Sequence, residues 1–145
     1  MALRGTPIDS IVAAIMRMEG SSSPNSVNQA IYRQTGMYNP GHIIWSPWSA
    51  SQGASKVTVN GRDWAAWPTE AEGEQAIANL LSQYVENKPG ITIQQAVFQY
   101  APPSENNSAL YASNLAQWTG IPTDTPLASV LKAGPLNPTI PPLET

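Results

Sequence analysis

Glu19 is the residue of this chain whose position best suits acid chemistry. It ends a stretch of apolar residues with helical spacing and directly precedes Gly20. The C-terminal end of a helix has partial negative charge, and together with the apolar neighbours Met16 and Met18 this charge favours the protonated carboxyl group. A carboxyl group that keeps its proton near neutral pH can act as a general acid. An exposed glutamate at a helix end is the alternative, and the residue types alone leave both open.

Asp63 is the candidate for a second catalytic carboxylate. Acid–base chemistry often pairs two carboxyl groups, of which one gives up a proton and the other takes one. Asp63 falls in a predicted hairpin that could face Glu19, but it also flanks a turn, and we favour a solvated position for it. Three further acidic residues are expected to form the dipole-favoured first turn of a helix, namely Glu70, Glu72 and Glu74.

The composition limits the chemistry to carboxylates, hydroxyls and aromatic rings. The 145 residues include no Cys, which excludes disulfides, thiol nucleophiles and Cys-ligated zinc. The single His, His42, argues against a His-based metal site or a Ser-His-Asp triad, and we expect backbone groups to satisfy it within a loop. We expect no metal and no cofactor. The formal net charge of −3 offers no basic surface, so we expect no nucleic-acid partner.

Aromatic side chains are a second group of residues that could contact a ligand. Five Trp and five Tyr accompany a single Phe, a balance that favours rings with a polar edge. Such rings can stack on the C–H face of a sugar, and the tryptophans at positions 45, 48, 64 and 67 are candidates. At least two of these four are expected to be core residues instead.

The spacing of apolar residues predicts a mostly helical chain with one inserted hairpin. Asn60-Gly61 is the dipeptide best suited to a type I′ turn, and it separates two strand-like segments, 56–59 and 62–67. Residues 37–54 show neither the helical nor the strand period of apolar residues, so we expect them to form a loop. Asn106 or Ser108 is expected to cap the helix that ends at Gly120. Helices are expected at residues 8–19, from 27 to about 35, at 70–87 and at 92–100. A further helix is expected from the cap at Asn106 or Ser108 to Gly120, and a last short one just after Pro126.

The length fits one domain, which we place at residues 1–134, followed by a proline-rich tail at 135–145. The first residues lack a sustained apolar segment, and the longest apolar run, residues 11–16, is too short to span a bilayer. We therefore expect synthesis in the cytoplasm without a signal peptide and no integral membrane segment. The final location stays open between a virion and the cell wall.

Several short motifs follow one another in order between residues 8 and 121. Glu19 ends an apolar helix, the loop Asn39-Pro40-Gly41-His42-Ile43 follows, and Pro68-Thr69 with Gly73 opens a later helix. Tyr100-Ala101 and Tyr111 come last, around a Pro-Pro-Ser-Glu-Asn stretch. This order resembles the cell-wall glucosaminidases of glycoside hydrolase family 73, and it is similar to muralytic proteins of phages and prophages. The glucosaminidase loop is usually Asn-Leu-Phe-Gly-Ile-Lys, so the different middle of the loop here leaves bond specificity open.

The resemblance implies a lysozyme-like fold of the mainly α (α+β) class, a helical domain with a small β-hairpin lobe beside a groove. It also implies Glu19 as the catalytic acid, Asn39 and Gly41 in a wall of the sugar groove, and Tyr100 near the reacting sugar. We add three residues as candidate contacts to substrate, namely Trp45, Trp64 and Tyr111.

The leading hypothesis is a peptidoglycan-cleaving glycosidase of the glucosaminidase, muramidase or lytic transglycosylase type, with peptidoglycan glycan strands as its partner. After Glu19 protonates the leaving oxygen, three routes are open: Asp63 activates water, the substrate N-acetyl group assists, or the muramyl 6-hydroxyl attacks and gives an anhydro product. The rival hypothesis is a phage or prophage structural or glycan-binding protein that keeps the lysozyme-like fold without catalysis and contacts other virion proteins.

Overall fold

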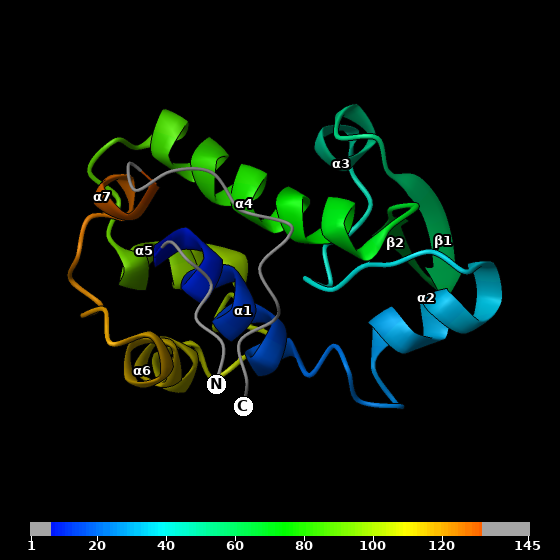
Figure 1. Ribbon diagram of the computed structural model, residues 1–145, viewed down its shortest axis with the longest axis horizontal. Helices are drawn as coiled ribbons and strands as arrows, with labels where there is room; N and C mark the ends of the chain where they lie inside the picture. Colours follow the sequence, from blue (N-terminus) through cyan, green and yellow to red (C-terminus); the bar gives the residue numbers. More distant parts are fainter. Residues whose placement is uncertain (1–6, 132–145) are drawn as a thin grey trace. The chain divides into compact units, whose positions relative to one another are not determined.

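The computed structural model describes residues 7–131, so the predicted tail at 135–145 lies outside the described residues. Helices make up 56% of the described residues, and they accompany one two-stranded antiparallel sheet (Figure 1). The predicted mainly α (α+β) class is confirmed at this level. None of the described helices is long and apolar enough to cross a membrane.

In chain order the elements are α1 (Pro7–Glu19), α2 (Val27–Thr35), α3 (Pro47–Ser51), β1 (Ser55–Val59), β2 (Arg62–Ala66), α4 (Glu70–Asn87), α5 (Ile93–Tyr100), α6 (Ser108–Thr119) and α7 (Leu127–Leu131).

Strong local signals account for the elements that form where they were expected. Asn60 and Gly61 have φ angles of 51° and 79°, the positive values that a type I′ turn needs, and they join β1 to β2 with Val59 opposite Arg62. Thr92 and Gln95 form the predicted capping box at the start of α5. Each of these signals acts within a few residues, so it is independent of the tertiary fold.

Two local predictions were wrong. Residues 47–51 form the short helix α3 inside the segment expected to be a loop, because Ser46 and Ser49 make a capping box and Pro47 occupies the first turn. The cap of α6 is Asn107, whose Oδ1 accepts a hydrogen bond of 3.1 Å from the Leu110 backbone N–H, rather than Asn106 or Ser108. Both differences shift a boundary and leave the fold class unchanged.

The chain divides into two compact units. The first, the helical unit, combines the residues up to Met18 with those from Ala78 onward, and the second, the hairpin unit, runs from Glu19 to Ile77. Helices α1 and α4 therefore each contribute residues to both units. The single domain over residues 1–134 stays a prediction.

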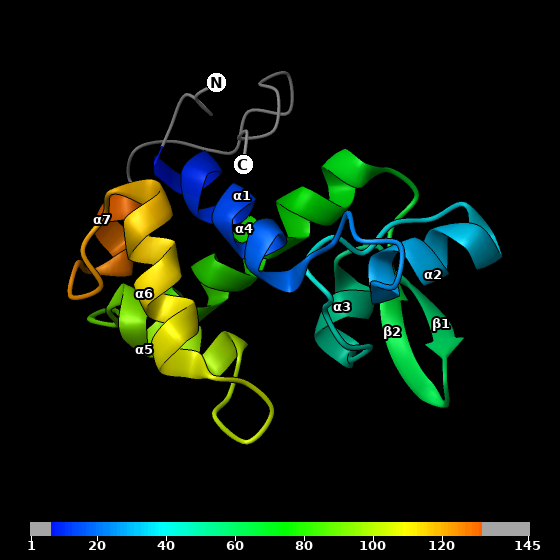
Figure 2. The same cartoon turned by 90° about the horizontal axis from the view of Figure 1, so that it is seen from below.

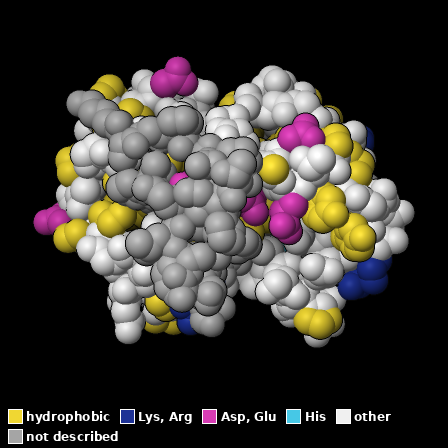
Figure 3. All heavy atoms as spheres, in the orientation of Figure 1, with side chains coloured by type: hydrophobic (Ala, Val, Ile, Leu, Met, Phe, Trp, Pro, Cys, Tyr) yellow, Lys and Arg dark blue, Asp and Glu magenta, His cyan; other side chains and the backbone are white. Residues whose placement is uncertain are grey.

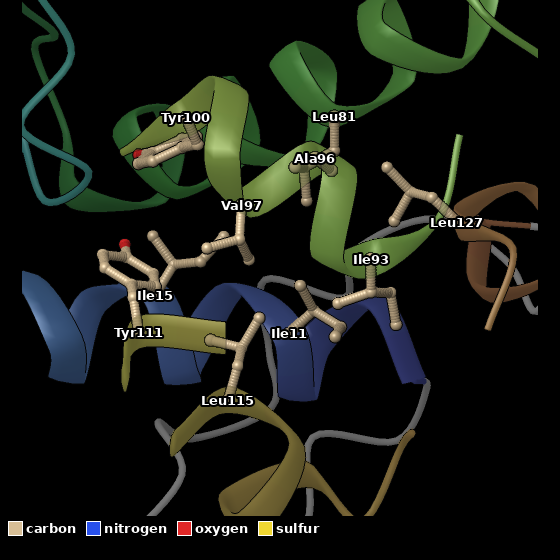
Figure 4. Close-up of a pocket in the computed structure, with 10 residues that line it drawn as sticks. All are labelled: Ile11, Ile15, Leu81, Ile93, Ala96, Val97, Tyr100, Tyr111, Leu115 and Leu127. Atoms are coloured by element: carbon tan, nitrogen blue, oxygen red, sulfur yellow. The ribbon is translucent and has the colours of Figure 1, made fainter. Parts of the chain in front are cut away.

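The helical unit has an apolar core built from α1, α4, α5, α6 and α7. Figure 4 shows Ile11 and Ile15 of α1 facing Val97 of α5 and Leu115 of α6. These side chains leave a cavity of about 10 Å³, which is at the lower limit for one water molecule and too small for a ligand. Burial also raises the pKa of the Tyr84 hydroxyl on α4 above its ordinary value, so this phenol stays neutral in the core.

The core of the hairpin unit lies between α2 and the hairpin, which are neighbours in both ribbon views (Figures 1 and 2). Its buried members are Ile31, Val57, Val59 and Ala66. Trp67 follows β2 and is 1% exposed, and its Nε1–H donates a hydrogen bond of 3.0 Å to the Gln52 carbonyl. Trp67 is thus a core residue, whereas Trp45, Trp48 and Trp64 are half-buried.

Gly73 allows the loop before α3 to approach α4 closely. A Cβ atom at position 73 would lie 2.5 Å from Cδ of Pro40. The proline ring is rigid and buried, so this overlap forces the loop away from the helix. We expect Gly73→Ala to lower the free energy of unfolding by about 1–3 kcal/mol, measured by urea denaturation.

Gly90 provides the matched control for Gly73→Ala, because a Cβ atom there meets nothing within 4 Å. Gly90→Ala should leave the free energy of unfolding unchanged or raise it by up to about 1 kcal/mol. Equal denaturation midpoints for the two variants would contradict the close approach of Pro40 to Gly73.

Candidate functional site

Glu19 and His42 form the centre of the candidate site. Glu19 is the last residue of α1, and Gly20 then turns the chain with a φ angle of 66°. His42 Nδ1 lies 3.2 Å from Glu19 Oε1, within hydrogen-bond distance. The two side chains are 11% exposed for His42 and 18% exposed for Glu19, so the carboxyl group is shielded and still reachable from solvent. A partly shielded carboxyl with an imidazole partner can hold and transfer a proton.

We expected backbone groups to form the hydrogen bonds of His42. The structure shows a backbone partner for only one of its two ring nitrogens. The backbone N–H of Asn28, in the first turn of α2, donates a hydrogen bond of 3.4 Å to His42 Nε2. The other nitrogen faces Glu19. His42 also has a φ angle of 50°, in the left-handed region that few residues other than glycine adopt. Such a conformation at a side chain that contacts a candidate acid is typical of functional sites.

A pair of buried asparagines fixes the turn after α1 and the loop that contains His42. The Asn28 side chain donates through Nδ2 to the Ser21 carbonyl at 3.0 Å and accepts from the Asn39 backbone N–H at 2.7 Å. The Asn39 side chain then closes its own loop, since Nδ2 donates to the Ile43 carbonyl at 2.8 Å and Oδ1 accepts from the Ile43 N–H at 2.9 Å. The chain segments that follow Glu19 and precede His42 are therefore joined through two amides.

Asn39 consequently differs from its predicted role. It was expected in a wall of the sugar groove, but it is 0% exposed and both ends of its amide bind Ile43. Gly41 of the same loop is also buried. A buried residue cannot touch a glycan, so these two positions shape the loop.

Trp64 of β2 lies beside the Glu19–His42 pair. Its ring meets the imidazole of His42 edge to face, with centroids 6.4 Å apart, and the Arg62 guanidinium lies over the indole at 4.8 Å. Ile44, which pairs with Trp64 across an isolated bridge, is 48% exposed. Trp45, the next residue, is half-buried, and its backbone N–H donates to the Asp63 carbonyl at 3.2 Å. Trp64 is thus the aromatic group in contact with His42, and Ile44 is an exposed apolar residue paired with it.

Asp63 is not brought to this pair. Adjacent residues of a strand point to opposite faces, so the Asp63 side chain is on the face opposite Trp64. It is exposed, and its Oδ1 accepts a hydrogen bond of 2.6 Å from Thr58 Oγ1, the residue directly across the hairpin. The solvated position that we favoured for Asp63 agrees with this geometry.

Under the glycosidase hypothesis, we therefore expect Asp63→Asn to change the rate of glycan cleavage by no more than a few-fold. The amide oxygen can still accept the Thr58 hydrogen bond, so the hairpin is kept. A catalytic base would instead cost about 10²–10⁴-fold on the same substitution. Initial rates on purified peptidoglycan check this, and a hundred-fold loss with an unchanged thermal unfolding midpoint would establish Asp63 as a second catalytic carboxylate.

The two tyrosines expected to contact substrate belong to the helical unit. Tyr111 on α6 is 2% exposed and lines the small apolar cavity, so it is a core residue and the prediction for it was wrong (Figure 4). Tyr100 at the end of α5 also lines this cavity but is only half-buried, and it stays a candidate. Both tyrosines lie at positions that fit the helical period of the apolar residues in α5 and α6. This period is as typical of core residues as of residues that bind a ligand.

Acidic residues do not gather into a metal site within residues 7–131, where no group of three or more His, Asp or Glu side chains could hold an ion. Glu70 and Glu72 are exposed in the first turn of α4 as expected, and acidic groups are visible over the start of this helix in Figure 3. Glu74 differs from the expectation, because it is buried, at 7% exposed. Glu19 is therefore the acidic residue of the described chain that combines partial exposure with an imidazole partner.

No family model, no curated protein and no solved structure matches this chain. What the fold and the site define is a mainly helical protein with a small antiparallel hairpin and one partly exposed carboxyl group held by an imidazole.

Proposed function

We propose that this chain is a peptidoglycan-cleaving glycosidase with a lysozyme-like fold, in which Glu19 is the general acid. The observation that supports this function most directly is the Glu19–His42 contact of 3.2 Å at the end of α1. The order of motifs that resembles family 73 glucosaminidases supports the substrate class, the β-1,4-linked amino sugars of the cell-wall glycan.

Glu19 donates its proton to the glycosidic oxygen while the bond between that oxygen and the anomeric carbon breaks. The developing positive charge on the sugar is then quenched from within the substrate, by the N-acetyl oxygen or by the muramyl 6-hydroxyl. In the first case a water molecule then attacks the anomeric carbon, the bond to the N-acetyl oxygen breaks, and the water's proton passes to the Glu19 carboxylate. In the second case the hydroxyl oxygen bonds to the anomeric carbon and its proton passes to the Glu19 carboxylate. Either route restores the acid. These routes are favoured over activation of water by Asp63, because Asp63 is on the hairpin face opposite Trp64.

Substrate binding on this unit uses the exposed apolar surface next to the acid. Ile44 is exposed and offers an apolar surface for the C–H face of a pyranose, and the Arg62 guanidinium, which lies over the Trp64 indole, provides a cation for a carboxylate of the muramyl lactyl group. Tyr100 belongs to the helical unit, and its contact with substrate stays a prediction from the motif.

Digestion of purified peptidoglycan tests the proposal. The released fragments are analysed by mass spectrometry before and after borohydride reduction, because reducible muramic acid, reducible glucosamine and anhydromuramic acid ends identify a muramidase, a glucosaminidase and a transglycosylase respectively. A heat-denatured sample is the control. Fragments from the native protein alone support a glycosidase, whereas binding to peptidoglycan sacculi without any fragments would support the rival, a structural or glycan-binding protein of a phage particle.

A further inference from the structure

We propose that His42 is a positioning residue that fixes which oxygen of Glu19 holds the acid proton, namely Oε2. This inference rests on the proposed function of Glu19 as the general acid. It arises from the two hydrogen bonds of the imidazole, one on each ring nitrogen.

The first step is the tautomer of His42. A backbone N–H can only donate, so Nε2 must accept from Asn28 and holds no hydrogen itself. A neutral imidazole has one ring hydrogen, which is then on Nδ1. His42 is therefore neutral, and its Nδ1–H donates to Glu19.

The second step is the consequence for Glu19. Its Oε1 lies 3.2 Å from Nδ1 and accepts this hydrogen bond. When Glu19 is protonated, a proton on Oε1 would face the Nδ1–H, so the proton occupies Oε2 instead. The imidazole thus selects one of the two oxygens, and it restricts rotation of the carboxyl group about its last bond. A general acid that is already aimed loses less entropy when it reacts.

The third step is the rigidity of the imidazole. The Asn39 carbonyl accepts a hydrogen bond of 3.2 Å from the His42 backbone N–H, and the Asn39 side chain holds both backbone groups of the next residue, Ile43. The edge contact with Trp64 restricts the ring from the hairpin side. The left-handed backbone of His42 is stable because these contacts surround it.

The tautomer can be measured without any activity assay, because His42 is the only histidine of the chain. In a ¹⁵N-labelled sample of the full chain, long-range ¹H–¹⁵N correlations of the imidazole distinguish a protonated Nδ1 from a protonated Nε2. We expect the Nδ1–H tautomer at neutral pH, and we expect Glu19→Ala to shift the Nδ1–H signal. The Nε2–H tautomer, or an Nδ1–H signal that Glu19→Ala leaves in place, would overturn the inference.

Two substitutions of His42 then separate positioning from structure. His42→Asn keeps an N–H donor at the atom that corresponds to Nδ1 and tolerates a positive φ angle, whereas His42→Gly removes the donor without backbone strain. Both variants lose the acceptor for the Asn28 N–H, so both should lose a similar amount of thermal stability. We expect kcat to fall by up to about 100-fold in His42→Gly with KM little changed, and to stay within a few-fold of the native value in His42→Asn.

A purely structural role would lower kcat to the same extent in both variants, and that result would overturn the inference. An active native protein with the Nε2–H tautomer would overturn the role of His42 alone. A native protein that releases no glycan fragments would instead overturn the proposed function, and with it any catalytic role of the contact, whatever tautomer the spectrum shows.

Discussion

Replacing Glu19 by glutamine is expected to lower the rate of peptidoglycan cleavage by about 10²- to 10⁴-fold. Glutamine has the size of glutamate, and its side-chain oxygen can still accept the hydrogen bond from His42 Nδ1. The amide cannot give up a proton to a departing sugar oxygen. The substitution therefore removes the chemistry and keeps the contacts, which is why the expected loss is in kcat and not in folding or in affinity for the glycan.

Glu86→Gln is the matched control for this substitution. Glu86 is exposed on α4, and the same exchange of carboxylate for amide there should leave the rate unchanged. The rates are read from fragments released from purified peptidoglycan, with thermal unfolding and binding to insoluble sacculi measured in parallel. If Glu19→Gln cleaved within about threefold of the native protein, Glu19 would not be the general acid and the glycosidase proposal would be withdrawn.

The elements of this fold were predictable where a signal lies within a few residues of its effect. The Asn60-Gly61 turn and the Thr92–Gln95 capping box are of this kind. Helix α3 also had a local signal, Ser46 followed by Pro47 and Ser49, but its five residues are too few to show a hydrophobic period. The sequence therefore did not predict the short helix α3, and it did not distinguish among the neighbouring residues that could cap α6.

The candidate site was predictable only in its first member. Glu19 was singled out from its place at the end of a helix, a property of the sequence next to it. The partnership with His42 depends on contacts across 14 and 23 positions of the chain, through Asn28 and Glu19 themselves. A single histidine between a glycine and an isoleucine gives no sign of such partners. The positive φ angle of His42 was equally hidden, because it follows from the way Asn39 closes its loop.

For Tyr111 and Asn39, the sequence motif could not show that the side chains are buried. A motif that resembles an active-site segment placed both on a binding surface, and tertiary packing buries both. Tyr111 fills the core between α1 and α6, and Asn39 accepts the hydrogen bond of the Ile43 N–H, which has no other acceptor among the described residues. Residues that belong to a functional motif can thus serve the site by shaping it.

Asn39→Ala should accordingly be among the most destabilising substitutions in the hairpin unit. The change leaves the buried Ile43 N–H without its partner, since the alanine methyl group cannot accept a hydrogen bond. The Ile43 carbonyl loses the Asn39 amide but still accepts from the Ala65 N–H at 3.1 Å. One buried polar group without a partner gives a loss of about 1–3 kcal/mol in the free energy of unfolding. For a chain of this size that loss lowers the Tm by about 3–10 °C.

The control for Asn39→Ala is Asn25→Ala, at an exposed position in the turn before α2, where the loss should stay within about 0.5 kcal/mol. Differential scanning calorimetry and urea denaturation give the two free energies. The histidine NMR signal adds a local readout, because a released loop lets the imidazole turn and the single Nδ1–H tautomer gives way to a mixture of both. An Asn39→Ala protein with native stability and an unchanged tautomer would show that the amide of Asn39 does not hold His42 against Glu19.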